Sequence, residues 1–238
     1  MITRAGPSPA KAAIRARRPV VAVNAGGVAL PAVDALAAAG ADCLFIDCER
    51  TAVSVESVPQ LARAAQAGGM SAVVRVPTRE PAFITRYLDC RVDGIVLPQV
   101  EDARACADLV ATARAATRGR EGDLLLIAQV ETVAGHARLE EIAAAPGIDL
   151  VLVGPNDLAH SMGFLGDTSR PELVAAVDDI ITRLGALGRP FGLPVTPATV
   201  AGLTRRGALF LYTTLDALLR PGLAGLKAGA GISHGDHA

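Results

Sequence analysis

Two carboxylates, Glu131 and Asp157, are the most informative residues of this sequence. Glu131 ends the apolar run 124–131, and Asp157 stands just beyond the apolar run 148–154. An isolated carboxylate among apolar neighbours is costly to desolvate, so two that face one cavity need a cation. Oxygen ligands without histidine or cysteine favour a hard ion, Mg2+ or Mn2+, with Co2+ as a third candidate. The pair predicts a metal site; alternatively, each carboxylate caps the next helix or pairs with an arginine.

Further polar residues stand at the ends of other apolar runs. Arg75 lies near the end of the third run, and its fixed charge suits a carboxylate or a developing enolate oxygen. The alternative for Arg75 is a structural ion pair with Asp47 or Glu49. The remaining candidates are Arg50 and Asp47 for catalysis, and Gln129, Gly154, Pro155, Asn156 and Glu49 for substrate binding. Their common position after apolar runs predicts that they meet in one site.

Eight apolar runs alternate with helical patterns along the whole chain. The runs are 20–26, 43–48, 71–77, 94–100, 124–131, 148–154, 190–196 and 208–214. Near-continuous apolar strands are typical of sheets that are covered on both faces. Eight βα units without a linker predict a single-domain (β/α)8 TIM barrel, which places active-site residues where strands end. An open doubly wound sheet is the alternative, but its glycine-rich phosphate turn is absent.

The ends of the chain and its composition complete the domain prediction. We expect an N-terminal arm, flexible or helical, over 1–18, the barrel over 19–230, and a flexible tail over 231–238. The arm is rich in arginine, so a transit peptide is the alternative. A net charge of -1 gives no sign of nucleic-acid binding, and no apolar run is long enough to cross a membrane. Four cysteines without a C-x-x-C pair indicate reduced thiols and a cytoplasmic protein.

Several of these segments together resemble the HpcH/HpaI-type metal-dependent class II pyruvate aldolases, relatives of the citrate lyase β subunit. Residues 129–132 resemble the family's Q-[IV]-E-[TS] motif, and residues 154–158 with 161–163 resemble its G-P-x-D-L…MG motif. The resemblance implies that Glu131 and Asp157 are metal ligands, and that residues 74–77 carry the enolate-stabilising arginine, Arg75. It also implies a homo-oligomer, trimeric or hexameric, often with an exchanged C-terminal helix.

One residue departs from the family pattern. Residues 46–50 resemble the family's I-D-x-E-H segment, whose histidine is held by the aspartate and moves protons, but the histidine position is Arg50. Arginine stays protonated near neutral pH and cannot act as a general base. Three alternatives follow: a metal-bound water moves the proton, His160 substitutes, or Arg50 binds a second anionic group of the substrate.

The leading functional hypothesis is a metal-dependent lyase, an aldolase. It would make or break a C–C bond next to a small-molecule 2-oxo acid such as pyruvate or oxaloacetate, through a metal-bound enolate. The first alternative is a citrate-synthase-like condensing enzyme of the same family, in which Arg50 meets an additional carboxylate. The second is a catalytically degenerate barrel that binds a metabolite without turnover. Enolate-dependent activity with added metal separates the two enzymes from the binding protein.

Overall fold

The computed structural model describes residues 6–232, and in it eight parallel strands close into a barrel in the order β1 to β8. The strands are β1 Val20–Asn24, β2 Cys43–Asp47, β3 Ser71–Arg75, β4 Gly94–Leu97, β5 Leu125–Val130, β6 Leu150–Val153, β7 Phe191–Pro194 and β8 Ala208–Thr214. All eight predicted runs are strands, and the (β/α)8 prediction is confirmed. Seven strands are shorter than their predicted runs, and β8 has the same bounds as its run.

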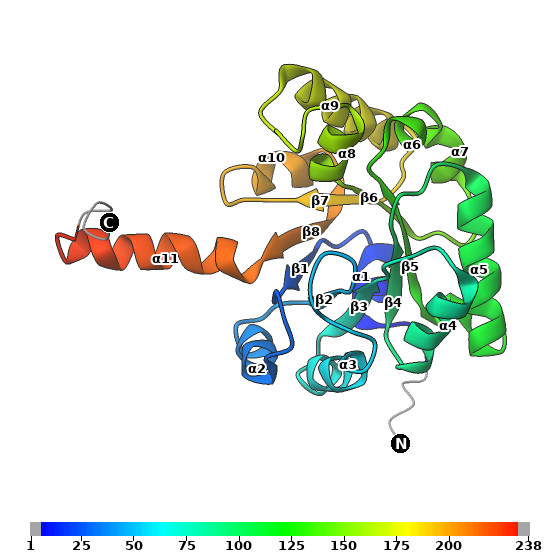
Figure 1. Ribbon diagram of the computed structural model, residues 1–238, viewed down its shortest axis with the longest axis horizontal. Helices are drawn as coiled ribbons and strands as arrows, with labels where there is room; N and C mark the ends of the chain where they lie inside the picture. The colour runs from blue at the N-terminus through cyan, green and yellow to red at the C-terminus, as the bar shows by residue number, and fades with distance from the viewer. Residues whose placement is uncertain (1–5, 233–238) are drawn as a thin grey trace.

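Helices surround the barrel, as Figure 1 shows. They are α1 Pro9–Arg15, α2 Leu30–Ala38, α3 Val58–Ala67, α4 Pro81–Asp89, α5 Ala103–Thr117, α6 Val133–Ala137, α7 Leu139–Ala144, α8 Pro155–Ser161, α9 Pro171–Ala186, α10 Val200–Arg205 and α11 Leu215–Gly229, with a 3-10 turn η1 Glu121–Asp123. Several begin with proline in the first turn, where its missing N–H costs nothing. No helix within residues 6–232 is long and apolar enough to span a membrane.

Alternation along each strand separates two apolar layers. Leu44 and Ile46 point outward and pack under the helices, whereas Cys43 and Phe45 belong to the interior cluster. The same period of two carries the next inward position of β2 to Asp47 and that of β3, after Val73, to Arg75. The top of the barrel interior is therefore polar because inward positions change from apolar to charged at the strand ends.

Helix α1 covers the opposite, N-terminal end of the barrel. Ala10, Ala13 and Ile14 pack into the interior cluster, and the Ala10 amide donates to Ser71 Oγ at 3.0 Å. Lys11 is 2% exposed and binds Asp149 at 2.8 Å and the Leu124 carbonyl. The structure has a helix over Pro9–Arg15, and residues 1–5 of the predicted arm lie outside the described part of the chain. This helix seals the barrel floor.

Helix α11 leaves the barrel and extends away from it, as the red helix in Figure 1 shows. None of its residues is buried, and its leucines Leu218, Leu219, Leu223 and Leu226 are exposed. On the barrel, Val21 of β1 is also exposed although it belongs to a strand. The last helix thus leaves its own barrel partly uncovered. The predicted tail 231–238 lies mostly in residues 233–238, outside the described residues.

Candidate active site

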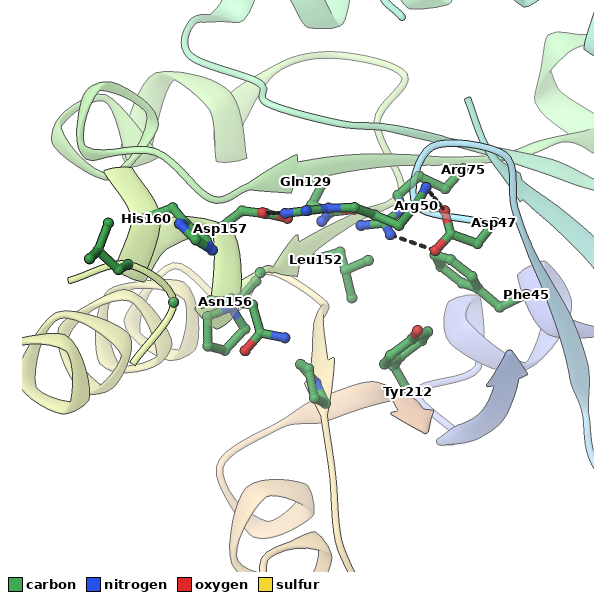
Figure 2. Close-up of a pocket in the computed structure, with 16 residues that line it drawn as sticks. Phe45, Asp47, Arg50, Arg75, Gln129, Leu152, Asn156, Asp157, His160 and Tyr212 are labelled. Atoms are coloured by element: carbon green, nitrogen blue, oxygen red, sulfur yellow. Dashed lines mark hydrogen bonds and ion pairs between the residues drawn. The ribbon is translucent and has the colours of Figure 1, made fainter. Parts of the chain in front are cut away.

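A cavity of about 550 Å3 opens at the rim where the carboxyl ends of the strands lie. Figure 2 shows the side chains that line it. Eight of the ten residues that the sequence singled out for catalysis, substrate or metal line it, and so does His160. The eight are Asp47, Arg50, Arg75, Gln129, Gly154, Pro155, Asn156 and Asp157. Glu49 and Glu131 lie behind this lining. Strand-end polar residues therefore meet at one site, as expected from their positions.

Asp47 and Arg75 form one unit at the barrel rim. They are register partners on neighbouring strands, and Arg75 donates from Nε to Asp47 Oδ1 at 3.0 Å and from Nη2 to Oδ2 at 2.6 Å. Arg75 Nε also lies 3.1 Å from Glu49 Oε2. The guanidinium is held from one side by two carboxylates, and its Nη1 has no protein partner among residues 6–232. This leaves Nη1 for an anion in the cavity.

Asp47 also organises its own loop. Its Oδ1 accepts the backbone amides of Glu49 and Arg50, each at 3.1 Å, and its backbone carbonyl accepts from the Thr51 hydroxyl. The Asp47 carboxylate therefore accepts hydrogen bonds from Arg75 and from these two amides. The side chain at position 50 leaves in another direction, so Asp47 does not hold it as the family's aspartate holds the histidine.

Glu131 is fully buried and held by two N–H donors. The Gln99 amide donates to Oε1 at 2.8 Å, and Gln129 Nε2 donates to Oε2. Burial raises the pKa of Glu131, while the Gln99 amide and the guanidinium groups of Arg75 and Arg50 limit that rise. Gln129 must turn its nitrogen toward Glu131, which leaves its Oε1 buried and without a partner beside the cavity.

Gly154 lets the turn between β6 and α8 approach Glu131 closely. A Cβ at this position would lie 2.6 Å from Glu131 Oε2 and 3.0 Å from Gln129 Nε2, closer than side chains tolerate. The turn therefore requires glycine for space. The following Pro155 starts α8, whose first turn carries Asp157 into the cavity wall.

Arg50 forms an ion pair with Asp157, so this carboxylate pairs with an arginine, as in the alternative that the sequence left open. Figure 2 shows this contact, with Arg50, Asp157 and the neighbouring Gln129 labelled. The Arg50 side chain is 53% exposed and that of Asp157 is 20% exposed. A guanidinium thus lies where the two predicted ligand carboxylates would share a cation.

The donor set at the rim fits a hard divalent cation. Four carboxylates, those of Asp47, Glu49, Glu131 and Asp157, surround the two guanidinium groups of Arg50 and Arg75. When all are ionised, an excess of two negative charges remains, which one divalent ion neutralises. The partnerless Gln129 Oε1 is an acceptor for a water on such an ion. Residues 6–232 contain no group of three or more histidine, cysteine or acidic ligands, so water and substrate would complete the coordination.

Two residues of the site were missed from the sequence. Asn24, at the end of β1, donates from Nδ2 to Tyr212 Oη at 3.1 Å and lies 3.5 Å from Asp47 Oδ2. Tyr212 of β8 lines the cavity. The signal for Asn24 was present, because it is a polar residue at a strand end like Asp47. Tyr212 was counted only as part of an apolar run.

Comparison with known proteins identifies the family. Residues 25–210 match the HpcH/HpaI aldolase/citrate lyase family. The chain belongs to this family. A pyruvate aldolase of Rhizobium etli is 35% identical over 83% of this chain and 87% of its own length. A hydroxypyruvate/pyruvate aldolase of Roseovarius nubinhibens is 32% identical over 79% of this chain and 82% of its own.

A solved HpcH/HpaI aldolase/citrate lyase family protein from Burkholderia cenocepacia superimposes with a TM-score of 0.82 at 28% identity. The match covers 92% of this chain and 98% of that one. The family match and the shared barrel confirm the resemblance drawn from residues 129–132 and 154–158. Arg50 lies inside the range that matches the family, residues 25–210.

Proposed function

We propose that this protein is a carbon–carbon lyase of the class II pyruvate aldolase type, acting on a small 2-oxo acid. The observation that carries the proposal is the arrangement at the rim: Arg75 offers a free Nη1 to the cavity that Asp157 and Gln129 also line. Aldolase relatives that share about a third of their residues with the chain support the reaction class. The substrate class is pyruvate or oxaloacetate.

Arg75 stabilises the negative charge that develops on the keto oxygen when the 2-oxo acid becomes an enolate. Its position is preorganised, because Asp47 holds two of its nitrogens and Glu49 balances its charge from behind. Glu49 lies outside the cavity lining, so it acts on a substrate only through Arg75. Gln129, Gly154, Pro155 and Asn156 form the wall against which the acid lies.

Glu131 and Asp157 would hold a divalent cation, Mg2+ or Mn2+ with Co2+ as a third candidate. When bound, the ion supplies Lewis acidity at the keto oxygen of the substrate. Gln129 orients Glu131 through its Nε2 and keeps Oε1 for a water. The Arg50 guanidinium competes with a cation for Asp157, because both neutralise the same carboxylate.

Arg50 is proposed as an anion-binding residue and not an acid/base group. Its exposed side chain lines the cavity, and a cation at Asp157 would release it toward the substrate. Proton transfer then falls to water in the cavity or to His160, which lines the same wall. Arg50→His should change the ratio of kcat/KM for glyoxylate, an anionic acceptor, to that for glycolaldehyde, a neutral one. An unchanged ratio would mean that Arg50 does not bind the anionic group of the acceptor.

The citrate-forming and the non-catalytic alternatives are less well supported. A tricarboxylate product carries three negative charges and needs several cationic groups to bind it. A divalent ion at the rim would only neutralise the two excess negative charges of the protein, so it would leave no net positive charge for such a product. Arg50 alone is available for further carboxylates, and Asp157 engages it. A degenerate barrel has no need of Glu131, Asp157 and Arg75 together, each held by specific partners.

Helix α11 supports a homo-oligomer. Its exposed leucines and the exposed Val21 of β1 are complementary apolar surfaces that one chain does not bring together. A second copy of this chain, exchanging α11, would cover both, in a trimer or hexamer. Leu223→Glu should lower the mass measured by light scattering, whereas Arg205→Glu on α10 should not.

Chelation tests the proposal. Pyruvate addition to glycolaldehyde should disappear after exhaustive treatment with EDTA and return with Mg2+ or Mn2+. Full activity after chelation would refute the metal requirement, and no addition under any metal would refute the aldolase reaction.

A further inference from the structure

The Tyr212 hydroxyl is a hydrogen-bond donor that has no acceptor among the described residues 6–232. We propose that Tyr212 donates a hydrogen bond to the carbonyl oxygen of the acceptor aldehyde, and so stabilises the negative charge that this oxygen gains when the C–C bond forms. The inference rests on the proposed function, since it names the group that receives the second substrate. It assigns a catalytic role to a residue of β8 that faces the cavity.

Strand β8 aims Tyr212 into the barrel. Phe210 lies in the interior cluster, and Tyr212 is the next residue on the same face and packs against that cluster. Its ring meets Phe45 edge-on, with centroids 4.8 Å apart and an interplanar angle of 71°. The small Ala22 is its register partner on β1. These contacts fix the ring, so the hydroxyl is preorganised.

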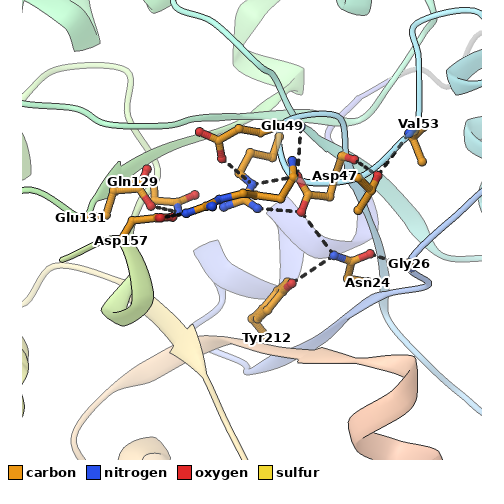
Figure 3. A network of polar contacts seen from close by, with 12 residues as sticks. Asn24, Gly26, Asp47, Glu49, Val53, Gln129, Glu131, Asp157 and Tyr212 are labelled. Atoms are coloured by element: carbon orange, nitrogen blue, oxygen red, sulfur yellow. Dashed lines mark hydrogen bonds and ion pairs between the residues drawn. The ribbon is translucent and has the colours of Figure 1, made fainter. Parts of the chain in front are cut away.

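The hydrogen-bond direction at Tyr212 follows from Asn24. Asn24 Oδ1 accepts the Gly26 amide at 2.8 Å, which identifies the other amide atom as the nitrogen. That nitrogen lies 3.1 Å from Tyr212 Oη and can only donate, so the phenol oxygen is the acceptor there. The hydroxyl hydrogen therefore points elsewhere, and residues 6–232 offer it no acceptor. Figure 3 shows this line of contacts from Asp47 through Asn24 to Tyr212.

The hydroxyl stays protonated. Burial raises the pKa of Tyr212, and the hydrogen bond from Asn24 only partly offsets this. Asn24 already donates to the oxygen, which polarises the O–H bond and makes it a better donor. A neutral, oriented phenol suits an oxygen that acquires charge during the reaction.

The position of Tyr212 separates it from the residues that bind the 2-oxo acid. In Figure 2 it lies on the β8 side, below Phe45, and away from the Arg50–Asp157 pair. In the addition step, the enolate carbon of the 2-oxo acid attacks the acceptor carbonyl carbon, and one C–C bond forms. The π electrons of the carbonyl move to its oxygen, where Tyr212 donates, and water in the open cavity supplies the final proton. Cleavage is the reverse of this sequence.

Two measurements on one variant test the assignment. Tyr212→Phe keeps the ring and its contact with Phe45, so the fold should be preserved. Addition of pyruvate to glycolaldehyde should fall about 100-fold in kcat/KM, as when one oxyanion donor is removed. Exchange of the pyruvate methyl protons with D2O, followed by NMR, needs no acceptor and should stay within about twofold of wild type.

The matched control is Tyr87→Phe. It makes the same chemical change at the only other tyrosine of the chain, which lies in α4 and outside the cavity lining. Both reactions should continue at the wild-type rate. Addition that survives in Tyr212→Phe, or exchange that falls in parallel with addition, would overturn the role of Tyr212. A wild-type protein without proton exchange would instead overturn the proposed function, and this inference with it.

Discussion

The two ends of the barrel bury charged residues in opposite ways. At the floor, Lys11 donates to Asp149 and to the Leu124 carbonyl, and Asp149 also accepts the Leu126 amide at 2.9 Å. Each of these two charged side chains has hydrogen-bonding partners elsewhere in the chain. At the rim, Gln129 Oε1 and Arg75 Nη1 have no partner among residues 6–232, and acidic charge is in excess. The buried charges at the floor therefore have partners within the fold, whereas the rim leaves polar atoms with which a ligand could pair.

The largest effect on turnover is expected at Asp157. Asp157→Asn replaces a charged ligand by a neutral one and removes the partner of Arg50. We expect kcat/KM for pyruvate addition to fall on the order of 10²- to 10³-fold, and Mn2+ binding measured by calorimetry to weaken. Asp149→Asn is the matched change at the floor, where it should cost stability and leave Mn2+ binding intact. If Asp157→Asn bound Mn2+ as tightly as wild type, the rim would not be a cation site.

A smaller effect on turnover is expected at Gly154. Gly154→Ala places a Cβ against Glu131 Oε2 and Gln129 Nε2. These side chains must move, and a displacement of a few tenths of an ångström at a catalytic group should lower kcat about 10-fold. Gly202→Ala in α10 is the control, because a Cβ there meets nothing within 4 Å. Equal activity in both variants would show that the spacing between Gly154 and Glu131 is not critical.

Arg50 tests whether the chain itself competes for the cation position. Removing the guanidinium in Arg50→Ala frees Asp157, so Mn2+ should bind about 2- to 5-fold more tightly, the size of a partly exposed ion pair. Direct calorimetry on the variant measures this without reference to activity. Weaker binding in Arg50→Ala would mean that Arg50 supports the ion site and does not oppose it.

No effect on turnover is expected at the floor. Lys11→Met leaves Asp149 without its cationic partner, and the free energy of unfolding should fall by about 3 kcal/mol. The value of kcat per folded molecule should not change, since Lys11 lies at the end opposite the cavity. Denaturant unfolding and activity at low temperature measure the two quantities. A fall in kcat without a loss of stability would contradict the division between floor and rim.

Much of this architecture could be predicted from local patterns. Eight apolar runs predicted eight strands, because a short, nearly continuous apolar run in an alternating βα chain is typical of a strand that is buried on both faces. Polar residues at run ends predicted the rim, since parallel strands bring their carboxyl ends together. The family motifs then agreed with the matched range of residues 25–210.

The side-chain directions in loops could not be predicted. Arg50 follows a strand by three residues, and only the turn closed by Asp47 decides that it reaches Asp157. The burial of α1 could not be predicted either, because the sequence indicated only a flexible or helical arm, and the acceptors of Lys11 lie far along the chain. Tyr212 was missed because a tyrosine in an apolar run resembles a core residue. Only the structure shows which residues of β8 face the barrel interior.

We infer that the rim converts a 2-oxo acid to its enolate with a divalent ion and Arg75. The most direct measurement is the exchange of pyruvate methyl protons with D2O, followed by NMR with no acceptor present. We expect exchange in the wild type with Mg2+ or Mn2+ and none after chelation. Arg75→Lys should lower the exchange rate about 100-fold, because lysine keeps the positive charge but lacks the planar guanidinium with its several N–H donors. Exchange at the wild-type rate in the chelated protein or in Arg75→Lys would contradict it.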